Sequence, residues 1–276
     1  MSGQDIRAQM SEIKRTGRIS DFLSFWLSNE LLPPVEQKTF DSYYKSYKKN
    51  FGAYIKKNYE EQLRELFQKL AEFDIPRVLE VGFGCGTESL WMALNGIDIK
   101  AIDVEQRFLA VAELRKKILE QTAGVKIRCE FKLLPLLDLD DNDKFDIVWM
   151  EQTFHHLEPR EDVLDKLGRI VKTGGYVVFS ETNFWNPLNQ IFLFKRRGFR
   201  TVINHAGVIW GNERILPAYV LQKSLKKRFF KTVSVRYFRL LPNVKIADKL
   251  TFLDAIMPNF IYPAFTHYNL VAKKIN

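Results

Sequence analysis

Apolar side chains recur at every third or fourth position in residues 60–73, which is the spacing of one face of an α-helix. The residues on this face are Leu63, Leu66, Phe67, Leu70 and Phe73. The positions between them are mostly polar or charged. The pattern predicts an amphipathic helix that ends before Pro76 and packs against the elements that follow it.

Short apolar runs rich in β-branched residues come next, and stretches with helical periodicity separate them. The predicted strands are residues 77–81, 99–103, 125–131, 145–150 and 176–180, and the predicted helices are residues 88–95, 106–121 and 160–171. Alternating strands and helices form right-handed crossovers, which make the strands parallel and place helices on both faces of the sheet. The pattern therefore predicts an α/β fold with a Rossmann-like, doubly wound sheet.

The alternation stops after Glu181. Residues 183–230 are aromatic and basic, and residues 232–240 and 267–274 are predicted as two further strands of what becomes a seven-stranded sheet. We expect the sheet to be mostly parallel with an antiparallel last strand. Residues 183–230 are then an insertion before the last two strands, expected to cover the substrate.

Residues 1–59 precede the first core helix and are predicted to form a helical N-terminal cap or lid. Pro33 and Pro34 interrupt this segment, and residues 43–59 are predicted as a separate helix. The expected division is a cap of residues 1–59 and a domain of residues 60–276.

Composition narrows the class of protein. The chain has 276 residues, of which 46% are apolar and 27% charged, so it contains enough apolar material for a full core. Cys85 and Cys129 are its two cysteines and have no metal-ligand spacing, so we expect a reducing compartment and no metal site. Because no apolar leader or membrane-spanning run is evident, we expect a cytoplasmic protein.

The net charge of +9 is concentrated in the last third of the chain. Residues 183–276 hold 16 Lys or Arg and 3 Asp or Glu. A surface of one sign attracts the phosphates of nucleic acids, lipid headgroups or diphosphate-linked sugars, and the same charge is equally consistent with a solvated basic face.

The most informative motif is the segment VLEVGFGCGTES. It contains a buried strand with Glu80, then Gly82, Gly84 and Gly86, and then the start of a predicted helix. Glycine lets the backbone turn tightly and approach a ligand closely, although the same residues can make a simple strand-to-helix turn. The spacing is not the G-x-G-x-x-G of dinucleotide folds, because Thr87 takes the third position, and no Gly-Lys-Ser/Thr of a P-loop follows.

This loop resembles that of the class I S-adenosylmethionine-dependent methyltransferases, in particular the small-molecule group with an acid and G-x-G-x-G after the first strand. A second match is Asp103, at the end of the second predicted strand, where the family places an acid on the ribose hydroxyls. A third is residues 145–181, which resemble the family's fourth strand, His-His loop, helix and Gly-Gly turn. The resemblance covers residues 60–182 and implies S-adenosyl-L-methionine as cofactor.

The resemblance also implies which residues bind that cofactor. They are Glu80, Gly82, Phe83, Gly84, Cys85, Gly86, Asp103, Val104, Asp138 and Glu151. One family element is missing, because residues 132–135 read KLLP where an acid near the adenine is usual. Asp138 is the candidate substitute, and apolar and main-chain contacts are the alternative. Cys85 is expected to be a small filler rather than a catalytic thiol.

Methyl transfer from a sulfonium requires near-attack geometry and no nucleophilic residue, but a general base helps when the acceptor is a hydroxyl or an ammonium. Histidine is the usual base near neutral pH. His155 and His156 follow the fourth strand, at the edge where open α/β sheets bind ligands, and His205 lies in the insertion. These three are the candidate catalytic residues, with packing as the alternative role for the His-His pair, and His267 is expected to be structural.

The cap carries a stripe of tyrosines, Tyr43, Tyr44 and Tyr47, on a segment that resembles the lid helix of many family members. A tyrosine hydroxyl there could reach the carboxylate of the cofactor. The alternative is that the stripe is the buried face of the helix, and that interpretation is the one we favour.

The residue types of the insertion indicate the class of methyl acceptor. Residues 183–200 place aromatic and aliphatic side chains beside the basic cluster of Lys195, Arg196, Arg197 and Arg200. This combination suits a helix lying on anionic lipid. It favours a small-molecule, lipid or lipid-linked glycan acceptor and a protein that is peripheral at the inner face of a membrane. An RNA methyltransferase and a non-catalytic cofactor-binding protein stay open as alternatives, and nucleic acid is the less favoured partner because no RNA-binding motif is evident.

Overall fold

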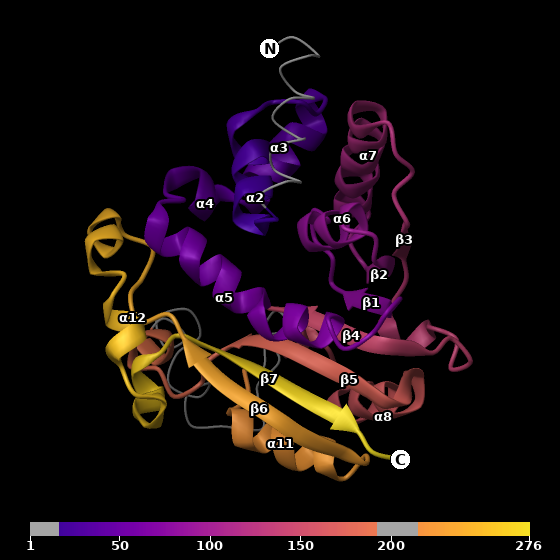
Figure 1. The fold of residues 1–276 in the computed structure, drawn as a ribbon, viewed down its shortest axis with the longest axis vertical. Helices are drawn as coiled ribbons and strands as arrows, with labels where there is room; N and C mark the ends of the chain where they lie inside the picture. The colour runs from indigo at the N-terminus through magenta and orange to yellow at the C-terminus, as the bar shows by residue number, and fades with distance from the viewer. Residues whose placement is uncertain (1–16, 192–214) are drawn as a thin grey trace.

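The computed structural model of the protein describes residues 17–191 and 215–276. Its strands are β1 (Arg77–Val81), β2 (Asp98–Asp103), β3 (Cys129–Leu133), β4 (Phe145–Glu151), β5 (Val171–Thr182), β6 (Phe230–Phe238) and β7 (His267–Lys274). They form one seven-stranded sheet in the order β3-β2-β1-β4-β5-β7-β6 (Figure 1).

The strand directions confirm the predicted fold class. β1 to β5 are parallel, and β7 pairs antiparallel with both of its neighbours, β5 and β6. The last strand in the sequence is therefore inserted between β5 and β6, and it alone runs against the other strands of this sheet.

Three predicted strands have the wrong bounds. β5 begins at Val171 rather than at Tyr176 and ends at Thr182 rather than at Ser180. β3 begins at Cys129 rather than at Val125, because the backbone N–H of Ile127 donates to Glu120 Oε1 at 3.0 Å instead of joining the ladder. β6 begins and ends two residues earlier than predicted, since Arg239 takes a positive φ of 65° after the strand.

Helices cover both faces of the sheet, as a doubly wound fold requires. On one face lie α2 (Ile19–Ser28), α5 (Ala53–Leu70), α6 (Thr87–Leu94) and α7 (Gln106–Ala123). On the other lie α8 (Arg160–Ile170) and α11 (Ala218–Lys226). Successive strand residues point to opposite faces, so that Val78 contributes to the first core and Leu79 to the second.

The N-terminal segment differs from its prediction. After α2 come α3 (Pro34–Tyr43) and the short α4 (Lys45–Lys49), and α5 then runs without a break through Tyr59. The predicted separate helix over residues 43–59 is wrong, and the expected boundary between residues 59 and 60 falls inside α5. The reason is that Tyr54, Ile55 and Tyr59 extend the same buried face as Leu63.

The insertion is only partly within the described residues, since residues 192–214 lie outside them. Its last part forms α11, which buries Leu221 and Leu225 against the sheet. Between β6 and β7 the chain forms η3 (Lys245–Leu250), α12 (Leu253–Ile256) and η4 (Asn259–Ala264). No helix in the described part of the chain is long and apolar enough to cross a bilayer.

Candidate functional site

The glycine loop joins β1 to α6 at the carboxyl edge of the parallel strands. Gly82 and Gly84 have φ values of +80° and +50°, a region that side chains disfavour. A Cβ on Gly82 would lie 2.3 Å from Thr153 Oγ1, and a Cβ on Gly84 would lie 2.3 Å from the hydroxyl oxygen of Tyr43. The loop therefore needs glycine both for its turn and for close approach to the β4 loop and the cap.

Asp103 orders this loop from the end of β2. Its Oδ2 accepts a hydrogen bond from the Gly84 N–H at 2.9 Å, and its Oδ1 accepts from the N–H groups of Val104 and Glu105 at 2.7 and 3.0 Å. Burial raises the pKa of Asp103, and these three donors oppose that rise. The carboxylate thus links the first two βα loops at the edge of the sheet.

A cavity of about 500 Å³ opens beside the loop, within the range of small-molecule sites. Gly82, Gly84 and Asp103 form one part of its wall. Its apolar wall consists of Val81, Ile102, Val104, Phe108, Leu134, Leu136 and Leu157. Glu151, Gln152, Thr153 and His156, from the end of β4 and the loop after it, also line the cavity.

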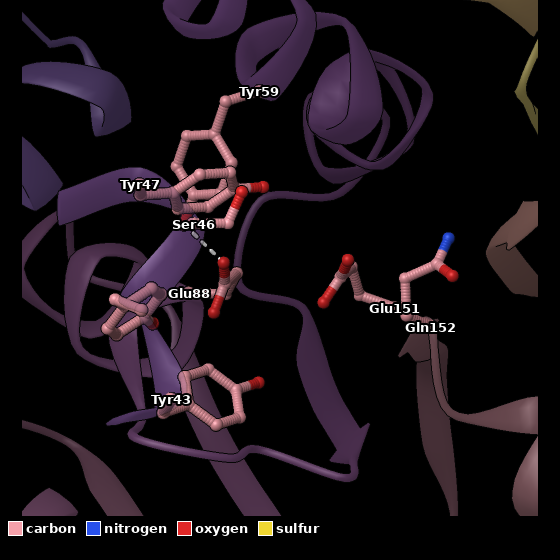
Figure 2. A pocket seen from close by; sticks show the side chains of 8 residues that line it. Tyr43, Ser46, Tyr47, Tyr59, Glu88, Glu151 and Gln152 are labelled. Carbon is pink, nitrogen blue, oxygen red and sulfur yellow. Dashed lines mark hydrogen bonds between the residues drawn. The ribbon is translucent and has the colours of Figure 1, made fainter. Parts of the chain in front are cut away.

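A second cavity of about 190 Å³ adjoins the first, because both are lined by Tyr43, Glu151 and Gln152. Figure 2 shows tyrosines of the cap and of α5 with Glu88 on one side of this space, and Glu151 with Gln152 on the other. The complete lining is Tyr43, Tyr44, Ser46, Tyr47, Tyr59, Glu88, Glu151 and Gln152. Two carboxyl groups and several phenols therefore share one small space.

Burial controls the charge of those two carboxyl groups. Glu88 is 7% exposed and accepts a hydrogen bond from the hydroxyl of Tyr59. Burial raises the pKa of Glu88, and burial together with the nearby Glu88 raises the pKa of Glu151 well above its usual range. A cationic group placed between them would favour their ionised forms, so the space is suited to an ammonium ligand.

Arg115 of α7 connects the cap to the glycine loop. It is fully buried, and its Nη1 donates to the Cys85 carbonyl at 2.6 Å and to Thr87 Oγ1 at 2.8 Å. The guanidinium carbon lies 4.5 Å from the ring centre of Trp26 and 5.0 Å from that of Phe40. Cation–π contacts thus hold the cap against the loop.

The four histidines of the chain differ in their surroundings. His155 is buried, and its Nδ1 lies 2.6 Å from Glu181 Oε2, while the other carboxylate oxygen accepts from the Phe154 N–H. His156 lines the larger cavity, with its ring centre 4.1 Å from that of His155. His205 lies outside the described residues. His267 contacts Thr266 Oγ1, and burial lowers its pKa well below its usual range.

The structure brings half of the expected cofactor-binding residues to the cavity. Gly82, Gly84, Asp103, Val104 and Glu151 line it. Four others are buried behind the loop. Glu80 accepts from the Ser89 hydroxyl, Phe83 packs on Phe131, the Cys85 carbonyl accepts from Arg115, and Gly86 precedes α6. Burial raises the pKa of the Cys85 thiol to about 12, which supports its expected role as a filler.

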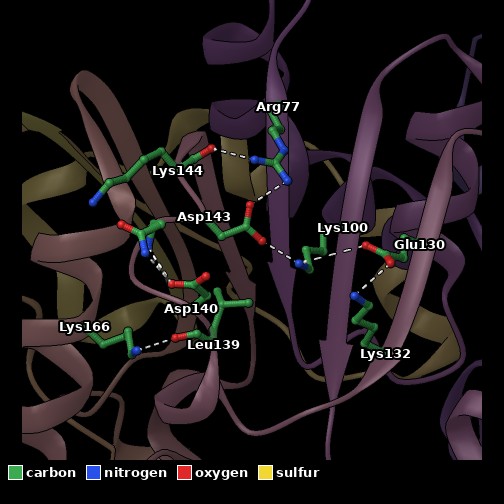
Figure 3. Close-up of polar contacts among 10 residues, drawn as sticks. Arg77, Lys100, Glu130, Lys132, Leu139, Asp140, Asp143, Lys144 and Lys166 are labelled. Carbon is green, nitrogen blue, oxygen red and sulfur yellow. Dashed lines mark hydrogen bonds and ion pairs between the residues drawn. The ribbon is translucent and has the colours of Figure 1, made fainter.

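Asp138 is not part of the cavity wall. It is exposed at the end of η1 (Leu136–Asp138), and Leu134 and Leu136 of the same segment line the cavity instead. Lys166 Nζ donates to the Leu139 carbonyl at 2.6 Å, which fixes the chain just after Asp138 (Figure 3). Arg77 and Lys100 then hold Asp143 at 2.6 and 2.5 Å, on the way to β4 (Figure 3).

The site also contains Glu88 and Tyr59, which the sequence did not single out. Glu88 and Tyr59 are 29 positions apart, so their contact could be read only from the fold. Gln152 has a φ of +46°, stabilised by a hydrogen bond from its N–H to the Ser180 carbonyl at 2.8 Å. Backbone strain of this kind concentrates at functional sites. Within the described residues, no group of His, Cys, Asp or Glu is arranged to hold a metal ion.

Comparison with known proteins agrees with this geometry. Residues 79–179 match a family model described as a methyltransferase domain. The ubiquinone biosynthesis O-methyltransferase of Pseudomonas syringae pv. tomato is 35% identical over 130 residues, which are 46% of this chain and 52% of that protein. The chain spans about half the length of the curated relatives it matches.

Solved structures share the fold at low identity. The magnesium protoporphyrin IX methyltransferase of Synechocystis PCC 6803, solved with bound SAH, superposes with a TM-score of 0.58 and 14% identity, covering 86% of this chain and 94% of that one. The [4+2]-cyclase SpnF superposes with a TM-score of 0.57 and 16% identity, covering 88% and 97%.

The strand order, the glycine loop and Asp103 at the end of β2 define a class I S-adenosylmethionine-dependent methyltransferase fold. Residues 79–179, which match the methyltransferase-domain model, contain the glycine loop and Asp103.

Proposed function

We propose that this protein transfers a methyl group from S-adenosyl-L-methionine to a small-molecule acceptor. The observation that carries the proposal is the pair of adjoining cavities at the glycine loop, one with Asp103 in its wall and the other with Glu88 and Glu151. Together they offer hydrogen-bond acceptors for the ribose hydroxyls and for the ammonium of that cofactor.

The larger cavity suits the adenosine. The Asp103 carboxylate accepts hydrogen bonds from the ribose hydroxyls, as acids do at this position in related folds. Val104, Phe108 and Leu134 provide apolar surface for the adenine. This supports the alternative considered for the missing third-strand acid, namely apolar contacts rather than Asp138.

The smaller cavity suits the amino-acid end. Glu88 and Glu151 accept hydrogen bonds from its ammonium, and that ammonium in turn offsets the cost of burying two acids. Tyr43 lies over Gly84 and closes this end of the site toward the cap. We assign Tyr43 a lid function, whereas Tyr44 is buried and bonded to Thr87 Oγ1 at 2.6 Å.

When bound, the sulfonium cofactor supplies an activated methyl group and a good leaving group for in-line displacement. The chain's own residues then orient the acceptor and exclude water. We propose His156 as the general base, because it lines the cavity. Its neighbour His155, held by Glu181, positions the loop. The proposed part of His205 in catalysis rests on sequence alone.

For the acceptor we propose a lipid or lipid-linked glycan, met by a protein that is cytoplasmic and peripheral at a membrane. Support comes from the basic last third of the chain and from its aromatic and aliphatic neighbours. A second candidate is a protein that binds the cofactor without transferring methyl groups. The similarity to a [4+2]-cyclase favours keeping it, since one fold can host unrelated chemistry.

Incubation with methyl-labelled S-adenosylmethionine and fractionated cell extract tests the proposal. We expect label in the organic-extractable lipid pool, and much less label with Asp103→Ala at the same cofactor concentration. Label in the water-soluble small-molecule pool would leave methyl transfer standing and remove the lipid acceptor. Label in RNA would assign a nucleic-acid acceptor, and no label despite cofactor binding would favour the non-catalytic candidate.

A further inference from the structure

The connection between β6 and β7 carries a set of large apolar side chains that face solvent. We call residues 244–262 the apolar projection. The fractional exposures of its most open side chains are 78% for Phe260, 65% for Ile256, 59% for Ile246 and 54% for Phe252. Folding ordinarily buries large apolar side chains. A cluster of them that stays exposed to solvent therefore indicates an interaction surface.

A second segment enlarges this surface. Residues 183–191 leave β5 and pack beside η4, because Asn183 Nδ2 donates to the Tyr262 carbonyl at 2.8 Å and Asn186 Nδ2 donates to the Ala264 carbonyl at 3.0 Å. The exposed apolar residues of this second segment are Trp185, Leu188 and Ile191. Apolar side chains from two distant parts of the sequence are thus brought to one region of the molecule.

The acidic and basic side chains of the apolar projection point in different directions. Asp248 Oδ1 accepts from the Tyr54 N–H at 2.8 Å, and Asp254 Oδ1 accepts from the Leu240 N–H at 3.0 Å, so both acids are turned inward. Lys245 and Lys249 are exposed. The outer surface of the projection therefore combines apolar side chains with positive charge.

The position of the projection relates it to the cavities. β7 begins at His267 opposite Thr182, the last residue of β5, so the connection before β7 lies at the carboxyl edge of the parallel strands. The glycine loop and Asp103 lie at that same edge. In Figure 1, α12 and its neighbours extend from the sheet at the end where β7 begins.

We propose that the apolar projection, with residues 185–191, docks on the surface of an anionic lipid bilayer. Exposed aromatic and aliphatic side chains interspersed with lysines suit the boundary between headgroups and acyl chains. The lysines match anionic headgroups, whereas against a second copy of this basic surface they would repel. The inference rests on the proposed function in one respect: it assigns the residues through which the protein would meet a lipid acceptor.

Co-sedimentation of the full chain with vesicles tests this docking. The probes are vesicles of phosphatidylglycerol and phosphatidylcholine, and vesicles of phosphatidylcholine alone. The unmodified protein is expected to sediment with the anionic vesicles. Ile256→Ser with Phe260→Ser should weaken that binding by about tenfold or more, because two exposed side chains no longer enter the interface. Lys245→Ala with Lys249→Ala should weaken binding to the anionic vesicles selectively.

The matched control is Ile75→Ser, which removes a side chain that is 75% exposed in the turn before β1, outside the projection. It should bind vesicles like the unmodified protein. All variants should keep their melting temperature and their affinity for S-adenosylhomocysteine, so a failure of docking is separable from a failure of the proposed function.

Three results would overturn the docking proposal. The first is absence of the unmodified protein from the anionic pellet. The second is an equal loss of binding in Ile75→Ser and in the Ile256→Ser, Phe260→Ser variant. The third is a dimer in sedimentation velocity that dissociates in that double variant, which would assign the surface to a second copy of the chain.

Discussion

Gly84 affects both the backbone conformation of the glycine loop and the shape of the cavity. Its φ is +50° and the Tyr43 ring lies directly against it. For Gly84→Val we expect a loss of stability of about 2–4 kcal/mol from backbone strain and crowding. We also expect affinity for S-adenosylhomocysteine to fall by ~100-fold or more, since the side chain enters the space for the ligand. Calorimetry and thermal melting measure the two effects.

Gly96→Val is the control for this substitution. Gly96 has a φ of +90°, and a Cβ added there would meet nothing within 4 Å, so valine adds backbone strain without filling the cavity. The two variants should lose stability together and differ in affinity. Equal affinity in both would mean that the glycine loop is only a turn.

Glu151 links the site to the pH dependence of stability. Burial, with Glu88, Glu181 and Glu80 nearby, raises its pKa in the folded protein. A raised carboxyl pKa stabilises the fold at low pH, and that contribution is lost as pH rises through the folded value. Glu151→Gln removes this loss of stability, so the variant should melt at a higher temperature than the parent protein. The expected difference is about 2–4 °C for each kcal/mol gained, and it should grow from about pH 5 to about pH 8.

Affinity should change in the opposite direction. If Glu151 accepts a hydrogen bond from the ligand ammonium, Glu151→Gln binds S-adenosylhomocysteine more weakly while melting at a higher temperature. Thermal scans over this pH range, with calorimetry at one pH, give both quantities. A variant that is less stable than the parent at high pH would contradict the assigned electrostatics.

Individual site residues could be predicted from the sequence where they lie at the end of a strand or directly after it. Gly82, Gly84, Asp103 and Glu151 each end or follow a buried run, and strand ends of a parallel sheet meet at one edge. Glu88 was not predictable in the same way, because its partner Tyr59 comes from a helix whose placement depends on the whole cap. Asp138 was misplaced because the strand before it starts and ends later than the apolar run indicates.

At the scale of elements, the joint between the cap, α7 and the glycine loop depends on Arg115. Its planar guanidinium both donates to the Cys85 carbonyl and stacks near Trp26. Arg115→Lys keeps the charge but loses the planar stack and most of the donors. We expect a destabilisation of about 2–3 kcal/mol in chemical denaturation, together with weaker binding of S-adenosylhomocysteine.

Arg64→Lys is the matched control, because Arg64 pairs with Glu61 on the exposed side of α5. It should change stability by less than about 0.5 kcal/mol. If Arg115→Lys is equally mild, then the cap is held mainly by its apolar core and not through this arginine.

Most helices and strands of the methyltransferase-domain region were predictable because they have a clear apolar period, and glycines or prolines lie at several of their ends. The start of β5 was not predictable in this way, because Val171 follows Ile170 of α8 directly. β1 and β7 have the bounds that the apolar runs predict. The cap was harder to interpret. Its aromatic and basic residues suit several helical faces, and the chain breaks at residues 50–52, where Asn50 and Gly52 are extended, rather than near Tyr59.

For the whole molecule, the arrangement of charge says more than its net value of +9. Buried acids gather around the two cavities, and Glu80, Glu88 and Glu151 all have raised pKa values because they are buried. Part of the basic excess lies on the connection before β7, at the same edge of the sheet. The sequence predicted the basic third, but the inward turn of Asp248 and Asp254 required the fold.

The most direct test of this account is calorimetric titration of the protein with S-adenosylhomocysteine. We expect one binding site, which Asp103→Ala weakens by about 1.5–3 kcal/mol, or roughly 10- to 150-fold. Asp138→Ala is the control, and it should leave the affinity unchanged because Asp138 is exposed outside the cavity. Binding of NAD in place of S-adenosylhomocysteine, or an affinity that Asp103→Ala leaves unchanged, would contradict the assignment of this cavity to the cofactor.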